Sequence, residues 1–270
     1  MRLYDYVASA NCYEARLLLA QLGCDYERVP IDIFSGDTLT DDFAAINPTR
    51  STPVLETDDG RLLQESNAIL WYLADGSEYL PDDPFERAHV LKWLILEQSD
   101  VMYGIGGLRF RLLTGRWTPD EPAAVQRREL GLDTLGMLET HLQDASFFVG
   151  DRYSIADISL YAYTHTAPDA GFELDDYPAV TGVAAPRRAA AGIHERPRAV
   201  SRERAGRRRL VGLRLRLPAE GASAEALNPV GSPPNFRAPP HRTARSWSGS
   251  RCYHWRSDCS SEFCTPSVQS

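Results

Sequence analysis

The first 80 residues alternate between strand-like and helix-like patterns of hydrophobic positions. Residues 2–7 are rich in β-branched and aromatic side chains and predict a strand, whereas residues 11–22 have apolar positions with helical spacing up to Gly23. A second strand is predicted over residues 26–32. A strand, a helix and a second strand in this order usually form a parallel pair with a right-handed crossover.

A hairpin and another helix follow. Residues 53–65 contain two strand-like runs around Asp58, Asp59 and Gly60, and an Asp-Gly pair is typical of tight turns between antiparallel strands. Ser66 precedes the apolar run "NAILWYLA" and is predicted to cap the helix that starts there. The stretch before the hairpin, which contains "INPTRSTP", is predicted to be a loop.

From Pro84 onward the pattern is helical only. Three segments have apolar positions with helical spacing, namely residues 85–115, 121–143 and 154–167. Turn-like segments such as "WTPDEP" separate them. The pattern therefore predicts an α/β domain over residues 1–78 and an all-α domain over residues 84–180.

The composition indicates a folded globular protein. Of the 270 residues, 43% are hydrophobic and 10% are aromatic, which suffices for a hydrophobic core. No run of about 18 apolar residues is present and the N-terminus does not resemble a secretory signal, so neither a membrane span nor export is predicted. The five cysteines are an odd number without a disulfide-like spacing. We therefore expect a cytoplasmic protein with free thiols.

The charge changes sign near residue 180. Residues 1–180 contain 13 Lys and Arg against 31 Asp and Glu, whereas residues 181–270 contain 16 against 6. This tail is rich in Arg, Pro and Ala without a sustained apolar face, so disorder is predicted. We also hypothesise a shift of reading frame near codon 180, because the next frame permits the codons of another amphipathic helix. An arginine-rich arm for nucleic acid is the alternative that we do not favour.

A metal site is not predicted. The tail contains four residues of ligand type, namely Cys252, His254, Cys259 and Cys264, but their spacing matches no known pattern of metal ligands.

Four motifs in the order expected for one family lie between residues 3 and 163. They are "LYDYVASANCYEARLLL", "INPTRSTPVL", "QESNAIL" and "SIADISLYAY". Together they resemble the glutathione S-transferase superfamily, with an active-site loop similar to that of zeta- and nu-class relatives. The resemblance implies a thioredoxin-like N-terminal domain followed by an all-α C-terminal domain. It also implies glutathione as co-substrate and a homodimer. From composition and spacing, no metal, no membrane partner and no nucleic-acid partner are predicted.

The resemblance implies that glutathione is conjugated to a small electrophile through its thiolate. Two alternatives stay open. One is a glutathione-dependent thiol-disulfide reductase or peroxidase that uses Cys12, and the other is a protein of this fold that binds ligands without catalysis.

Two motifs supply the residues expected to bind glutathione. Thr52 precedes Pro53 between a loop and a strand, where a cis peptide bond fits the chain direction. The resemblance implies that the backbone of Thr52 pairs with the cysteinyl part of glutathione. Glu65 and Ser66 lie at the start of a helix, whose free N–H groups favour negative charge. The resemblance implies that this pair binds the γ-glutamyl group.

Three residues near the first helix are candidates for handling the thiol. A thiol near pKa 8.5 needs a donor or a helix N-terminus to become a thiolate at neutral pH. Asn11 and Glu14 have the spacing of a capping box, so Asn11 is predicted to be the N-cap. Ser9 then remains the donor, and it matches the first serine of the "SSC" signature of zeta-class relatives. Cys12 is expected either to be buried and inert or to carry out the redox alternative.

Further residues are expected near the second substrate or in the core of the helical domain. The electrophile pocket is expected to draw on four side chains, namely Met102, Tyr103, Phe110 and Trp117. Arg109 and Arg111 are expected to bind carboxylates or to form a solvated helix face. Ser154 and Asp157 are predicted to form a capping box with a structural role, because Asp follows Ser by three positions before an apolar run.

Overall fold

The computed structural model of the protein describes residues 1–183. The front part contains a mixed sheet with strand order β2-β1-β3-β4. Its strands are β1 (Arg2–Asp5), β2 (Glu27–Pro30), β3 (Val54–Glu56) and β4 (Leu62–Gln64). β1 and β2 are parallel, whereas β3 is antiparallel to β1 and to β4. The predicted parallel pair and the predicted hairpin are both confirmed.

Helices cover both faces of this sheet. They are α1 (Ala10–Leu22), α2 (Asp41–Ile46) and α3 (Ser66–Ala74), with a 3-10 turn at Asp37–Leu39. Leu3 and Leu55 pack against α1 and α3, whereas their chain neighbours Tyr4 and Val54 pack against Phe43 of α2. Successive side chains of a strand point to opposite faces, so α2 lies on the face opposite α1 and α3.

The prediction of a plain loop before the hairpin was wrong, because α2 forms there. Thr40 caps α2, and its Oγ1 accepts a hydrogen bond from the N–H of Phe43 at 3.2 Å. Phe43 is the buried anchor of this short helix. A single apolar anchor produces no periodicity, which is why the hydrophobic pattern did not indicate a helix.

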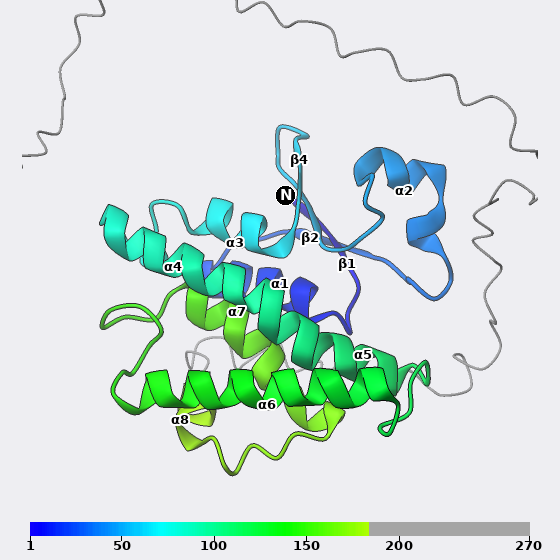
Figure 1. Cartoon of the computed structure of the whole chain (residues 1–270). Helices are drawn as coiled ribbons and strands as arrows, with labels where there is room; N and C mark the ends of the chain where they lie inside the picture. The colour runs from blue at the N-terminus through cyan, green and yellow to red at the C-terminus, as the bar shows by residue number, and fades with distance from the viewer. Residues whose placement is uncertain (184–270) are drawn as a thin grey trace, which may run out of the picture. The chain divides into compact units, whose positions relative to one another are not determined.

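The back part is entirely helical. It contains α4 (Pro84–Leu96), a π-helical segment η2 (Glu97–Gly106), α5 (Gly107–Leu113), α6 (Pro122–Gln143), α7 (Ile155–Thr164), a 3-10 turn (Ala167–Ala170) and α8 (Pro178–Gly182). Figure 1 shows α4, η2 and α5 as one continuous rod beside α6, with α7 between this pair and α1. The α/β front and the all-α back that the sequence predicts are confirmed.

Glycines let the backbones of η2 and α6 approach closely. A Cβ on Gly104 would lie 3.0 Å from the backbone nitrogen of Gly131, so a larger residue does not fit without a shift. On another side of η2, a Cβ on Gly106 would lie only 2.3 Å from the ring of Tyr163 in α7. Widened π-helical turns often occur at functional sites, and this one borders the cleft described below.

The predicted capping box of α7 is confirmed. The Asp157 carboxylate accepts hydrogen bonds from the Ser154 N–H at 2.8 Å and from the Ser154 hydroxyl at 2.9 Å. Its other oxygen accepts from the N–H of Phe148 at 3.0 Å. Both residues are fully buried, so their role is to start the central helix of the back part.

Within residues 1–183, no helix is both long and apolar enough to cross a membrane. The predictions made for the tail, including its disorder and the four residues of ligand type, concern positions that, apart from residues 181–183, lie outside the described residues.

Candidate active site

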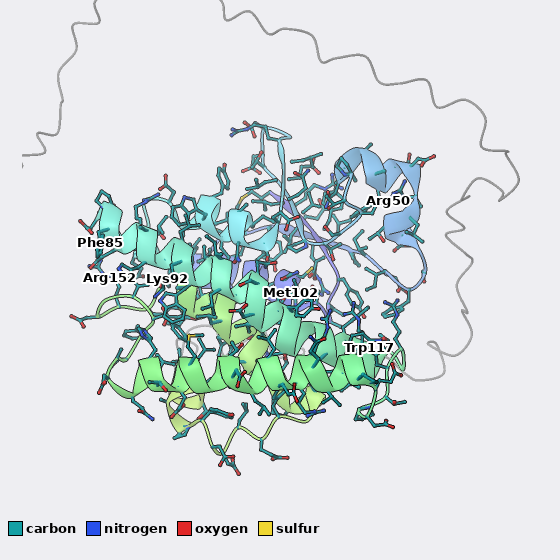
Figure 2. All side chains as sticks on the ribbon, in the orientation of Figure 1. Arg50, Phe85, Lys92, Met102, Trp117 and Arg152 are labelled. Carbon is teal, nitrogen blue, oxygen red and sulfur yellow. The ribbon has the colours of Figure 1, made fainter. Side chains whose placement is uncertain are left out.

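A cleft of about 540 Å³ lies where the start of α1, the loop before β3, the end of η2, α5 and α7 meet. Its lining includes three of the residues predicted to bind glutathione or handle its thiol, namely Ser9, Asn11 and Thr52. Figure 2 shows Met102 on the rod formed by α4, η2 and α5, and Arg50 beside α2. Both residues line the cleft, so it draws on the front and the back part of the chain.

Ser9 is the N-cap of α1, so the prediction that Asn11 holds this position was wrong. The backbone of Ser9 is extended, with φ −81° and ψ 128°, and its Oγ accepts a hydrogen bond from the N–H of Cys12 at 3.3 Å. This bond occupies an oxygen lone pair, and a hydroxyl can still rotate to donate its proton to a ligand. Ser9 therefore places a donor in the cleft at the positive end of α1.

Asn11 is already helical and links three elements. Its Oδ1 accepts hydrogen bonds from the Ser66 hydroxyl of α3 at 3.3 Å and from the Tyr163 hydroxyl of α7. Because both partners donate to the oxygen, the amide NH₂ is the group of Asn11 that remains to donate into the cleft. Asn11 is therefore a second donor near Ser9.

Cys12 lies beneath the cleft without lining it. Its side chain is 0% exposed, and its Sγ accepts a hydrogen bond from the N–H of Tyr6 at 3.4 Å. Burial, together with the nearby charge of Asp5, raises the pKa of the Cys12 thiol to about 12. At neutral pH this thiol is protonated and shielded from solvent, which is unfavourable for a nucleophile.

The Thr52–Pro53 peptide bond is cis, as predicted, and Thr52 lines the cleft. Ser66 is the first residue of α3 and not its cap, so that prediction was wrong. Glu65 holds the cap position with φ 71° and makes no side-chain capping bond. The first N–H groups of α3 therefore have no side-chain cap, a suitable end for a carboxylate. Pro53, Glu65 and Ser66 do not line the cleft themselves.

Two buried carboxyl groups lie behind the cleft, where the front and back parts meet. Glu14 of α1 and Glu97 of η2 are both fully buried, and neither forms a salt bridge within residues 1–183. Burial and the charge of Glu97 raise the pKa of Glu14 well above its usual range. Burial raises the pKa of Glu97 to about 7. The buried site therefore favours the protonated form of both carboxyl groups, compared with the same groups in water.

The residues expected to form the electrophile pocket divide into two groups. Met102 and Phe110 line the cleft. Tyr103 is 45% exposed and, like Trp117, is absent from the lining. Arg109 and Arg111 both line the cleft, which excludes a purely solvated role for either.

Tyr163 and Arg50 are site residues that the sequence pattern did not indicate. Tyr163 stands in the motif "SIADISLYAY", where it was indistinguishable from the apolar stripe of α7. Arg50 has φ 56° and donates to the backbone oxygen of Thr40 at 2.8 Å, which ties the loop before β3 to the start of α2. Within residues 1–183 no group of three His, Cys, Asp or Glu side chains is placed to hold a metal ion.

These features define a protein with a thioredoxin-like α/β domain, an all-helical domain and a cleft between them. A family model described as the N-terminal domain of glutathione S-transferase matches residues 8–75, and one described as the C-terminal domain matches residues 91–184. The chain belongs to the glutathione S-transferase family.

Individual relatives carry different activities in their names. The chain is 30% identical over 192 residues to a maleylacetoacetate isomerase of Pseudomonas aeruginosa, a match that covers 68% of this chain and 89% of the relative. It is 42% identical to a glutathione S-transferase of Pseudomonas fluorescens with a known crystal structure, with a TM-score of 0.65 over 67% of this chain and 91% of that one. The family thus indicates a glutathione-dependent transferase or isomerase.

A third comparison concerns a structure with bound ligand. It is a glutathione transferase family member of Pseudomonas fluorescens with two glutathione bound, 24% identical, with a TM-score of 0.62 over 71% of this chain and 91% of that one. At this identity the likeness shows the fold alone.

Proposed function

We propose that this protein is a glutathione transferase that ionises the thiol of bound glutathione with Ser9 and transfers the thiolate to a small electrophile. The observation that carries the proposal is the position of Ser9. Its hydroxyl is in the cleft, at the N-terminus of α1, beside Thr52. A donor and a helix N-terminus both stabilise a thiolate over a thiol, so both lower the pKa of a thiol held there.

The cleft has complementary groups for the rest of glutathione. Thr52 precedes the cis-proline at the edge of β3, which suits backbone pairing with the cysteinyl part. The uncapped start of α3, with Glu65 and Ser66, suits the carboxylate and ammonium of the γ-glutamyl group. Family models of both glutathione S-transferase domains, and a 42% identical solved relative named as a glutathione S-transferase, support this choice of co-substrate.

The chemical step needs no group beyond the two substrates. The thiol proton passes to water, the thiolate sulfur forms a bond to the electrophilic carbon, and a leaving group such as chloride departs with the electron pair of its own bond. Ser9 and Asn11 both donate toward the sulfur position, so they favour the ionised reactant.

The burial of Cys12 disfavours the redox alternative. A mixed disulfide with glutathione requires a thiolate that a second sulfur can reach. Cys12 is 0% exposed and its pKa is raised to about 12. We therefore assign Cys12 a packing role under the site.

The test is the pH titration of the thiolate absorbance of bound glutathione. We expect an ionisation below the value of a free thiol, about 8.5. Ser9→Ala should raise it by about 1 to 2 pKa units, the size of a lost hydrogen bond to a charged group, and Cys12→Ala should leave it unchanged. Thr40→Ala is the matched control, because it removes an N-cap hydroxyl from α2 outside the cleft. An unshifted thiol in the wild type would refute the proposal.

We further propose that the protein is a homodimer that pairs through α3 and α4. An open groove between these helices is lined by apolar side chains that stay exposed in one chain, including Tyr72 at 45%, Leu91 at 47% and Ile95 at 60%. A second copy would bury this surface. Sedimentation should give a dimer for the wild type and a monomer for Ile95→Lys. Leu132→Lys changes an apolar side chain that is 43% exposed on α6, and this variant should stay dimeric. A monomeric wild type would refute this interface.

A further inference from the structure

Three arginines gather at the mouth of the cleft, where α5 turns into α6. Arg111 and Arg116 line the cleft, and Arg127 of α6 lies next to them. We call these three residues the cationic mouth. Figure 2 shows Trp117, whose ring lies next to Arg111 and Arg127, at this turn. The mouth belongs to the back part of the chain.

Within residues 1–183, no carboxylate lies within salt-bridge distance of the cationic mouth. Arg109, only two positions from Arg111, shows the contrast. Its guanidinium makes two hydrogen bonds to Asp169, at 2.9 and 2.8 Å. Residues 1–180 have far more acidic than basic side chains, so this local excess of positive charge is unusual for the chain.

The three positively charged guanidinium groups repel one another. Burial, followed by the charges of Arg127 and Arg116, lowers the pKa of Arg111. Such repulsion is unfavourable, and an anion bound between the groups would relieve it.

Aromatic rings hold these arginines in place. The guanidinium carbon of Arg111 lies 4.7 Å from the ring centre of Trp117, and that of Arg116 lies 4.9 Å from the ring centre of Phe110. Stacking restricts the side chains before a ligand arrives, so less conformational entropy is lost when the ligand binds. Arranged charge, rather than mobile surface charge, is typical of a recognition site.

We infer that the second substrate of this enzyme is an anionic electrophile with a small apolar body and a carboxylate or similar group. Its body contacts Met102 and Phe110, and its anionic group pairs with Arg111 and Arg116. This inference rests on the proposed function, because it describes the partner of the glutathione thiolate. The glutathione carboxylates have another site at the start of α3, on the front part of the chain.

The experiment compares two electrophiles that differ in one charge, 4-chloro-3,5-dinitrobenzoate and its primary amide. In both reactions glutathione displaces chloride, so each enzymatic rate is divided by the rate without enzyme. We expect the wild type to prefer the acid and to lose this preference as salt is added. Arg111→Gln and Arg116→Gln should each raise KM for the acid about tenfold, with kcat, the amide kinetics and KM for glutathione nearly unchanged.

Arg152→Gln is the control, because it removes an equal charge from an exposed turn remote from the cleft. The inference is overturned if the wild type does not prefer the acid. It is also overturned if Arg111→Gln and Arg116→Gln raise KM for glutathione instead, since the mouth would then bind the co-substrate.

A binding measurement separates this inference from the proposed function. The non-reacting anion 3,5-dinitrobenzoate should bind the wild type by calorimetry and bind Arg111→Gln about tenfold more weakly. If that holds while bound glutathione shows no lowered thiol pKa, the anion site stands and the transferase proposal fails. If the anion does not bind but the thiol is ionised, the transferase proposal stands and the anion site fails.

Discussion

The wild-type protein is predicted to lose stability as the pH rises, and replacing Glu97 by glutamine is predicted to prevent this loss. Glu97 Oε2 accepts hydrogen bonds from the amides of Asn67 and Gln98, each at 2.9 Å, whereas its Oε1 has no hydrogen-bond partner among the described residues. Both carboxyl oxygens of the neighbouring Glu14 also lack one there. Buried negative charge without a cation is unfavourable, so this site favours the protonated form.

The direction and the size of this change of stability with pH follow from the pKa of Glu97. Burial raises it from 4.5 to about 7, so the folded protein binds this proton more tightly than the unfolded chain. Protonation of Glu97 therefore contributes to the free energy of unfolding. This contribution is complete below about pH 4.5 and is lost as the pH rises through about 7. It amounts to about 3 kcal/mol, of which about 2.5 kcal/mol disappears between pH 5 and pH 8. Glu14 acts in the same direction, because its pKa is also raised.

The assay is thermal unfolding at pH 5 and at pH 8, at one fixed protein concentration. Any cost of burying the new amide of Glu97→Gln applies at both pH values, so only the difference between them counts. Relative to the wild type, the variant should gain about 2.5 kcal/mol more at pH 8 than at pH 5, roughly 5 to 10 °C in Tm.

Glu139→Gln is the matched control for this assay. Glu139 is also buried, but its carboxylate accepts the N–H groups of Ala179 and Val180 at 3.1 and 3.0 Å. This variant should be destabilised by similar amounts at both pH values. If Glu97→Gln likewise changes stability equally at pH 5 and pH 8, the assigned role of the buried pair is wrong.

Two further predictions concern the surroundings of the site. Cys12→Ala should keep transferase activity. In the native wild type, iodoacetamide should label the half-buried Cys24 but not Cys12, because a buried thiol with pKa about 12 is not ionised. Peptide mass mapping identifies the labelled cysteines. Gly106→Ala should lose about 1 to 3 kcal/mol and weaken glutathione binding in calorimetry, since its Cβ would lie 2.3 Å from the Tyr163 ring. Gly136→Ala, with nothing within 4 Å, should instead gain slightly. Rapid labelling of Cys12, or equal effects of both glycine changes, would contradict these expectations.

The elements that the sequence predicts correctly depend on short-range signals. Gly23 ends α1 with φ 65°, and Gly60 closes the β3–β4 turn with φ 79°, conformations that glycine adopts without strain. The capping box of Ser154 and Asp157 spans only three positions. Such signals can be recognised in the sequence alone, because all interacting residues lie within a few positions of one another.

The errors at the site have long-range causes. Asn11 and Glu14 have the spacing of a capping box, and Ser9 fits the same cap, so local chemistry did not separate the two interpretations. The structure separates them because Asn11 bonds to Tyr163, which is 152 positions further along the chain. Glu14, expected as the capping partner, is buried near Glu97 instead. No spacing rule connects residues of different domains.

The tail remains a prediction. The family match ends at residue 184, close to where the charge of the chain changes sign. Resequencing the gene around codon 180 tests the hypothesis of a shifted reading frame. An intact frame, together with closely related genes that encode the same arginine-rich tail, would contradict it.

The two parts of the chain contribute different chemistry to one cleft. In the proposed function, Ser9 and Asn11 donate from the front part, at the start of α1, whereas the cationic mouth comes from α5, α6 and the turn between them in the back part. Asn11 joins the two, because its Oδ1 accepts from Ser66 and from Tyr163. The direction in which its amide points therefore depends on how α7 packs against α1. It follows that substitutions in the α1–α7 contact should change the thiol pKa even where they touch no substrate, whereas substitutions in the cationic mouth should change the choice of electrophile alone.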